Sequence, residues 1–190
     1  MDKEERSDHD LLRAGRRGEN EALEALIERY QRPLYTFLLR MVGPSHADDL
    51  FQETWRRALH AMPRFDDRNL LGWLFRIARN LAVDRARREG RWVPLDDGVR
   101  EMAWRSPDSS PDRAMVNREL EEKIRAAVAR LPPEQREVFL MRMEGQLPFQ
   151  TIADIQGVSI NTALARMQYA LQKLRKALAE YWPATEGEQT

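Results

Sequence analysis

The sequence predicts an all-α fold of two helical domains joined by a flexible linker, and three observations predict it. Apolar residues recur at helical spacing in stretches rich in Leu, Ala, Arg and Glu. Strand-like alternation is not sustained anywhere. Residues 90–111 lose the helical period and collect Pro, Gly, Asp and Ser, as linkers do. We therefore expect domains at 1–90 and 112–182, a linker at 91–111, and an acidic tail at 183–190.

The first two helices of the N-terminal domain are expected on either side of Gly18. A short helix begins near Asp10 and ends at this glycine. A long amphipathic helix then begins near Asn20, since its apolar residues recur at steps of three and four, and it ends at Gly43. Pro33 lies inside this helix, where its ring and missing N–H should produce a kink.

Two more helices are expected before the linker. Ser45 can cap the first of them, which runs to Pro63. Asn69 can cap the second, which runs from Leu70 to about Arg88. The apolar positions of this last helix are Leu70, Trp73, Leu74, Ile77, Leu81 and Val83. Within the linker, Trp92, Met102 and Trp104 suggest a segment that docks on something, or that packs on its own domains.

The C-terminal domain opens with two helices separated by a proline pair. Ser110-Pro111-Asp112 is a strong start for a helix that runs to about Arg130. Pro132-Pro133 breaks that helix and starts another, which ends at Gly145.

The last part of the chain carries the pattern of a helix-turn-helix. Residues 148–157 form a short helix, and Gly157-Val158-Ser159 form a three-residue turn. Ser159 can cap a longer helix from Ile160 to about Trp182. In DNA-binding proteins the first such helix braces the second, whose N-terminal turns enter the major groove. Helical hairpins that touch no DNA contain similar turns, so the pattern alone leaves both interpretations open.

The composition excludes several classes of site. The chain has no cysteine, so disulfides and thiolate metal sites are excluded and a cytoplasmic location is favoured. Its histidines, His9, His46 and His60, lack ligand spacing. We expect no metal, no cofactor and no catalytic group, because the chain has no cysteine, no convergent histidines and no glycine-rich phosphate loop. No apolar run is long enough to span a bilayer, and the acidic N-terminus is unlike a signal peptide.

The charges are segregated although the net charge is zero. Residues 55–92 hold ten basic and four acidic side chains, whereas residues 1–54 hold eight basic and twelve acidic ones. Residues 159–182 are basic again. Such a distribution suits a protein with one face for DNA and another for a protein. The alternative is that these arginine-rich helices are merely solvated.

Two blocks of the sequence resemble bacterial sigma factors, in particular the small extracytoplasmic-function group. LPPEQREVFLMRMEG followed by PFQTIADIQGVSINTALARM is similar to the fourth conserved region of that family. YQRPLY, DDLFQETW and WLFRIARN, in this order, are similar to its second region. The resemblance covers about residues 10–90 and 115–180. It implies a non-enzymatic alternative sigma factor that binds core RNA polymerase and directs it to specific promoters.

The resemblance also implies partners and a docking helix. The partners would be core RNA polymerase, double- and single-stranded promoter DNA, and an anti-sigma protein. Asp49, Gln52 and Glu53 fall on the helix that docks on polymerase in the family. Their spacing places acidic and amide groups on one face, which suits a basic partner helix. Without the resemblance, the same residues would be an ordinary solvated face.

In the family the helix at 70–88 opens the promoter. Asn80 can hydrogen-bond the edge of an extruded base, and the arginines of this helix can neutralise phosphates. Trp73 and Phe75 are candidates for stacking on bases. Trp73, however, shares an apolar stripe with Ile77, which favours a place in the core for it. The loop from Phe65 to Asn69 matches the base-capturing loop. The residues expected to contact DNA here are Phe65, Asn69, Arg76, Arg79, Asn80, Arg85, Arg87 and Arg88.

The helix that follows the turn departs from the family pattern. Leu164 and Ala165 stand where many relatives carry polar groups, and Gln168 suits adenine, so we expect an A/T-tolerant element. The candidates are Asn161, Thr162, Leu164, Ala165, Arg166, Gln168, Tyr169 and Lys173. An apolar stripe, formed by Ile160, Leu164, Met167, Leu171, Leu174 and Leu178, belongs to the core or serves a protein partner as well.

Two alternatives stay open at this point. A sigma-like protein could sequester a regulator without engaging promoters, in which case Leu164 and Ala165 would mark lost DNA recognition. The other alternative is a helix-turn-helix repressor with a helical sensing domain. The arginines of residues 55–92 suit such a sensing domain poorly.

Overall fold

A computed structural model describes residues 6–65, 69–89 and 111–181, with the side chains of 111–118 left out. Within these ranges all regular structure is helical, as the sequence predicts. Trp92, Met102 and Trp104, expected to dock the linker, lie outside the described residues, as does the acidic tail.

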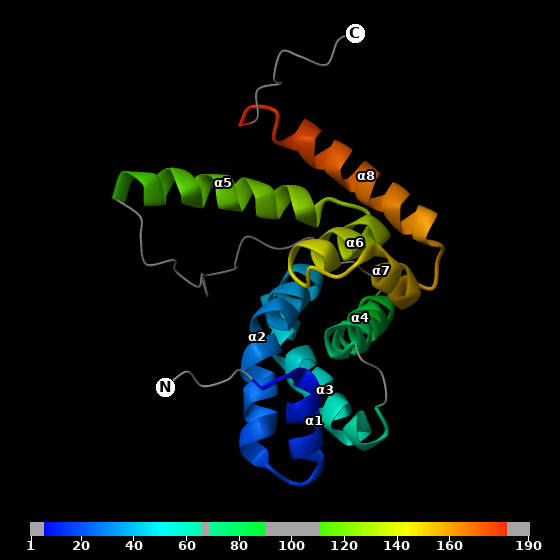
Figure 1. Ribbon diagram of the computed structural model, residues 1–190. Helices are drawn as coiled ribbons and strands as arrows, with labels where there is room; N and C mark the ends of the chain where they lie inside the picture. The colour runs from blue at the N-terminus through cyan, green and yellow to red at the C-terminus, as the bar shows by residue number, and fades with distance from the viewer. Residues whose placement is uncertain (1–5, 66–68, 90–110, 182–190) are drawn as a thin grey trace.

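In residues 6–65 and 69–89, the N-terminal domain contains four α-helices and one short 3₁₀ helix (Figure 1). They are α1 (Asp8–Arg16), α2 (Asn20–Val42), α3 (Pro44–Ala61), η1 (Met62–Arg64) and α4 (Leu70–Glu89). Helix α2 packs against α1, α3 and α4. It continues through Pro33 as one helix.

Two cap predictions in this domain have different outcomes. Asn69 caps α4 as expected, since its Oδ1 accepts a hydrogen bond of 2.9 Å from the backbone N–H of Gly72. The prediction of Ser45 as a cap is wrong. Helix α3 begins at Pro44, directly after Gly43, which is two residues before the start that a cap at Ser45 would give. A proline suits this first position because its fixed φ is helical and its missing N–H would have had no helical partner there.

The C-terminal domain contains α5 (Pro111–Ala129), α6 (Pro133–Met143), α7 (Phe149–Gln156) and α8 (Ile160–Ala177). Gly157 ends α7 in the left-handed region, at φ +68°, which only glycine adopts at low cost. Ser159 caps α8 as predicted, with its hydroxyl accepting from the N–H of Thr162 at 3.1 Å. Helix α8 ends before the predicted Trp182, so its regular part is shorter than its sequence pattern suggests.

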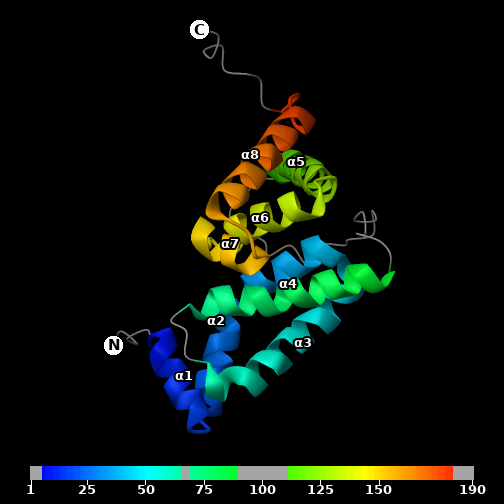
Figure 2. The same cartoon turned by 90° about the vertical axis from the view of Figure 1, so that its right-hand side faces the viewer.

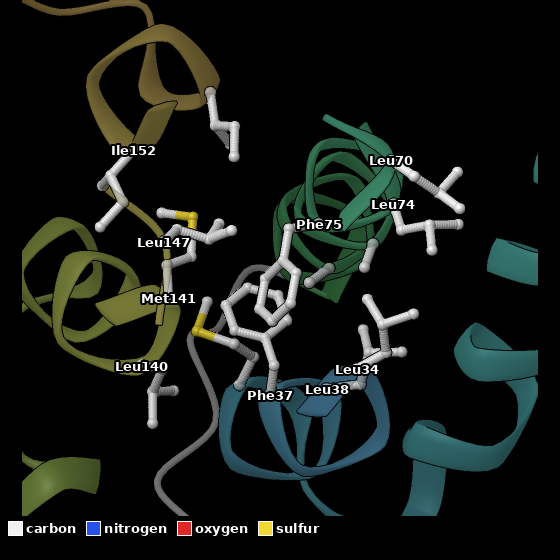
Figure 3. Packing of buried hydrophobic residues seen from close by; sticks show 14 of the residues in the cluster. Leu34, Phe37, Leu38, Leu70, Leu74, Phe75, Leu140, Met141, Leu147 and Ile152 are labelled. Atoms are coloured by element: carbon white, nitrogen blue, oxygen red, sulfur yellow. The ribbon is translucent and has the colours of Figure 1, made fainter. Parts of the chain in front are cut away.

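The two domains pack against each other through a shared hydrophobic core. Helices α6 and α7 lie over α2 and α4 (Figure 2). Phe75 of α4 is fully buried, and its ring centroid lies 5.1 Å from that of Phe37. Met141 and Leu147 face these rings from the C-terminal domain (Figure 3). The two helical domains that the sequence predicts are therefore in direct contact.

Candidate nucleic-acid and protein interfaces

Helix α3 presents the side chains predicted to dock on a protein partner. Asp49 and Gln52 are exposed, whereas Trp55 lies on the buried side of the helix. Glu53 accepts hydrogen bonds from Arg56 at 2.6 and 2.7 Å and from Arg57 at 2.7 Å. These bonds, chiefly those from Arg56, lower the pKa of the Glu53 carboxyl to about 2. This face of α3 therefore carries the exposed Asp49 and, beside it, the Glu53 carboxylate paired with two guanidinium groups.

Helix α4 exposes most of the polar groups predicted to contact DNA. Arg76, Asn80, Arg87 and Arg88 are all solvent-exposed. Arg85 is held by Glu89, with a nitrogen–oxygen distance of 2.5 Å. Four groups on this helix are thus available to a ligand without any rearrangement.

The aromatic candidates of this region are in the core. Phe65 is only 7% exposed, and its ring lies 4.4 Å from that of Trp73. Arg16 holds the carbonyl oxygens of Met62 and Phe65, which secures the turn before α4. The side chain of Phe75 lies on the buried side of α4 and is fully buried. The expected exposure of Phe65 to DNA is corrected here, because its ring fills the space beneath Trp73.

Asn69 and Arg79 are partly buried and contact the C-terminal domain. The amide of Asn69 donates to the hydroxyl of Thr151 at 3.1 Å. Arg79 donates from Nε to Oε2 of Glu137, also at 3.1 Å. Sequence reasoning missed Thr151 and Glu137, because both contacts join residues far apart in the chain. The only hint was an acidic residue inside α6, a helix that is otherwise largely buried.

Helix α8 packs one side against the core and exposes the other. Ala163, Ala170 and Leu174 form its buried side. Ala165 and Arg166 are partly buried, and Arg166 donates to the side-chain oxygen of Gln156 at 2.8 Å. The other predicted contact residues are exposed, namely Asn161, Thr162, Leu164, Gln168, Tyr169 and Lys173.

The apolar stripe of α8 is split by this orientation. Leu174 is buried, and Met167 and Leu178 pack against the core. Ile160, Leu164 and Leu171 are exposed, with 42% of Leu164 accessible. Leu164 is therefore outside the core, which leaves DNA or a protein as its possible partner.

Arginine at position 164 should be tolerated by the fold. Because Leu164 is exposed, we expect Leu164→Arg to change the free energy of unfolding by less than about 0.5 kcal/mol. The added cation should strengthen binding to a random DNA duplex and steepen the salt dependence by about 0.9 in log–log slope. Thermal melting and duplex titration of the full chain measure both effects. A large fall in melting temperature would show that Leu164 belongs to the core after all.

Two kinds of feature are absent from the residues that the structure describes. No group of three or more His, Cys, Asp or Glu side chains there is placed to hold a metal ion. None of the helices in the same ranges is both long and apolar enough to cross a membrane.

Comparison with known families and proteins agrees with this arrangement. Residues 26–91 match the family model for sigma-70 region 2, and residues 121–174 match that for sigma-70 region 4. The chain is 30% identical over 185 residues to the ECF RNA polymerase sigma factor RpoE of Cereibacter sphaeroides, covering 94% of this chain and 99% of that protein. It is 29% identical over 174 residues to the ECF RNA polymerase sigma factor SigW of Bacillus subtilis, covering 87% and 93%.

Solved structures share the fold. CnrH, solved in complex with the cytosolic domain of CnrY, superposes with a TM-score of 0.66 at 24% identity, covering 91% of this chain and 97% of CnrH. The sigma factor RpoE from Bartonella quintana, solved with the anti-sigma factor NepR, gives 0.64 at 22% identity, covering 82% and 96%. At these identities the likeness speaks for the fold alone.

Proposed function

The chain belongs to the extracytoplasmic-function group of the sigma-70 family, and on this premise we propose how its surfaces carry out the work of an alternative sigma factor. Such a factor binds core RNA polymerase and directs it to specific promoters. The observation that carries the proposal is the coincidence of two family matches, in family order, with two helical units. We assign residues 1–90 to polymerase binding and promoter opening, 91–111 to the linker, and 112–182 to the upstream element.

Core polymerase is proposed to bind at α3. The exposed Asp49 and Gln52 lie one helical turn apart, and Glu53 adds a carboxylate that stays ionised because Arg56 and Arg57 bond to it. A basic partner helix complements such a face. The opposite side of α3 is packed on its own domain, so docking requires no unfolding.

Strand opening is proposed to involve α4. Asn80 is an exposed amide with both donor and acceptor atoms, which is the chemistry that reads the edge of an unpaired base. Arg76, Arg87 and Arg88 supply exposed cations along the same helix for the phosphates. The aromatic rings of Phe65 and Phe75 are buried, so we assign no base stacking to these two residues.

Duplex DNA is proposed to bind at the N-terminal turns of α8. Helix α7 braces it through the core residues Ile152 and Ile155, and the capped start of α8 carries the exposed Asn161 and Thr162. Leu164 and Gln168 follow on the exposed side, so contacts with a thymine methyl group and with adenine support an A/T-tolerant element.

An anti-sigma protein is proposed as a second partner of α8. Ile160, Leu164 and Leu171 form an exposed apolar strip that the core does not use. Exposed apolar side chains grouped along one helix are favourable sites for a partner helix. A cytoplasmic location follows from a role beside RNA polymerase.

Run-off transcription tests the proposed function most directly. Purified core polymerase, the chain and a library of genomic fragments should yield discrete transcripts that core polymerase alone does not make. Their start sites would also reveal the promoter. A protein that only sequesters a regulator would yield no transcript, and a repressor would bind fragments without initiating on any of them.

Removal of Arg87 and Arg88 should weaken DNA binding broadly. Both side chains are exposed at the end of α4, so their replacement by alanine leaves the core unchanged. Each lost phosphate contact should reduce the log–log salt slope by about 0.9 for duplex DNA. Affinities of the holoenzyme for several promoter sequences, measured over a range of salt, provide the test. A loss confined to one promoter would instead indicate contact with bases.

A further inference from the structure

Helix α7 ends in a side chain that joins the core of the C-terminal domain to a predicted DNA contact on α8. This side chain belongs to Gln156, the last residue of α7, and its amide bonds to both Glu137 and Arg166. We propose that Gln156 is a positioning residue, which holds the guanidinium group of Arg166 where it meets a DNA phosphate. The inference rests on the proposed function, because it takes Arg166 to be a DNA-binding residue.

The amide of Gln156 is held in one orientation by two acceptors. Its Nε2 donates to Oε2 of Glu137 at 2.8 Å and to the backbone carbonyl oxygen of Glu134 at 3.1 Å. These bonds use both hydrogen atoms of the amide nitrogen. The amide oxygen can only accept, so it faces away from the two acceptors and toward a donor on α8.

Glu137 is a fixed anchor for that amide. Its side chain is 2% exposed, and its Oε2 also accepts from Nε of Arg79 at 3.1 Å, which compensates the negative charge. A buried carboxylate keeps such partners, because an unpaired charge is costly to remove from water. Since close packing confines a buried side chain to one rotamer, Glu137 fixes the amide of Gln156 as well.

Arg166 is held at one end and open at the other. Its Nη1 donates to the side-chain oxygen of Gln156 at 2.8 Å. A guanidinium group is a rigid plane with several N–H donors, so one bond at Nη1 orients the plane without using the rest. Within the residues that the structure describes, Nε and Nη2 of Arg166 have no hydrogen-bond partner and neither is buried. These donors are available for an anion.

The open end of Arg166 lies on a polar flank of α8. Thr162 precedes it by four residues, and Tyr169 and Lys173 follow at steps of three and four, so all of them share one side of the helix. Thr162, Tyr169 and Lys173 are exposed. A helix seated in the major groove turns the middle of its exposed surface to the bases and its flanks to the two backbones. A cation on a flank therefore suits a phosphate better than a base.

The bond to Gln156 contributes by ordering Arg166 before DNA arrives. An arginine that is free in solvent loses rotamer freedom when it binds a phosphate, and this ordering typically lowers affinity by about two- to tenfold. A guanidinium group that is already held avoids much of that loss. The phosphate itself is neutralised by Arg166 alone. Gln156 therefore affects the affinity for DNA and leaves the number of neutralised phosphates unchanged.

Titration of the full chain with a labelled random DNA duplex, over a range of salt, tests the inference. Gln156→Met keeps the length of the side chain and removes both functions of the amide. We expect affinity to fall about two- to tenfold with the log–log salt slope unchanged, because the phosphate contact is still made. Arg166→Met should weaken binding and also reduce the slope by about 0.9. The double variant should bind as Arg166→Met does, because Gln156 acts only through Arg166.

Gln150→Met is the matched control. Gln150 is an exposed glutamine on the same helix, and its amide nitrogen donates to Asp154 at 2.9 Å, so the same atoms and a similar bond are lost away from Arg166. This variant should bind DNA as wild type does. Arg166→Lys provides a second measurement if Gln156→Met melts well below wild type. Lysine keeps the charge and loses the planar fork, so affinity should fall with the slope unchanged.

The outcomes separate this inference from the proposed function. Wild-type affinity in Gln156→Met or in Arg166→Lys, in chains that melt as wild type does, would overturn the inference. So would losses that add in the double variant, or a salt slope that falls in Gln156→Met, since Gln156 would then act on DNA by itself. In each of these cases run-off transcription by the wild-type chain shows that the proposed function stands. If the wild-type chain binds the duplex and yields no transcript, the proposed function fails, and the titration still measures the role of Gln156. If it binds no duplex, either alone or with core polymerase, the assignment of α8 to DNA fails and the inference fails with it.

Discussion

Reversal of charge at Asp49 and Glu53 together is expected to abolish binding to core RNA polymerase and to leave the fold intact. Asp49 is exposed, and Glu53 contacts only Arg56 and Arg57 of its own helix among the bonds found for it. Replacement of both by lysine removes two negative charges, adds two positive ones and leaves those arginines uncompensated. Against a basic partner, juxtaposed like charges cost several kcal/mol, which corresponds to a loss of at least about 100-fold in affinity.

The measurement is a titration of labelled chain with core polymerase, together with thermal melting. Glu24→Lys with Glu28→Lys is a matched control, since it reverses two exposed charges on α2. The control should bind as wild type does, and both double variants should melt within a few degrees of it. Equal affinities for Asp49/Glu53 and control variants would remove the docking role from α3.

Alanine at Asn80 is expected to impair strand opening and to spare closed-complex formation. The side chain is exposed on α4, so its loss leaves the core untouched. One amide can act only on a base that is already unpaired. A specific amide–base contact is worth about 1–3 kcal/mol, so the equilibrium constant for strand opening should fall by roughly 5- to 150-fold.

Permanganate footprinting on a linear promoter reports the unpaired thymines, and a gel-shift assay reports the closed complex. Asn20→Ala, the same substitution at an exposed position of α2, should open the promoter normally. A template with a pre-melted bubble should rescue Asn80→Ala more than it helps wild type. Equal help for both proteins would show that Asn80 does not act on unpaired bases.

Local chemistry explains why so much of the helical structure is predictable from sequence. Ser159 and Asn69 cap their helices with short polar side chains, and Gly157 supplies the left-handed residue that ends α7. Each of these devices acts within three or four residues of itself. The exception, at Ser45, involves a choice between two starts of one helix that lie two residues apart, and the helix begins at Pro44. The family resemblance likewise depends on contiguous segments, and the family matches confirm it.

The exposure of a single side chain is less predictable. The stripe on α8 has helical spacing throughout, yet Leu174 is buried and Leu164 is not. Periodicity indicates which residues share a face of the helix, but which part of that face is covered depends on how α5, α6 and α7 pack against α8. Phe65 shows the same limitation: a loop residue by sequence, it is buried because the ring of Trp73 lies beside it.

The sequence by itself therefore determined most of the helices, the two family regions and the set of charged and amide groups that we propose for binding to DNA and polymerase. Only the tertiary structure decided that Arg79 meets Glu137, and Asn69 meets Thr151, across the two domains. The physical reason is distance along the chain: Arg79 and Glu137 are 58 residues apart, so no local rule brings them together. They meet because the apolar residues around Phe75 and Met141 are buried jointly, and this burial places the polar groups at its edge in contact.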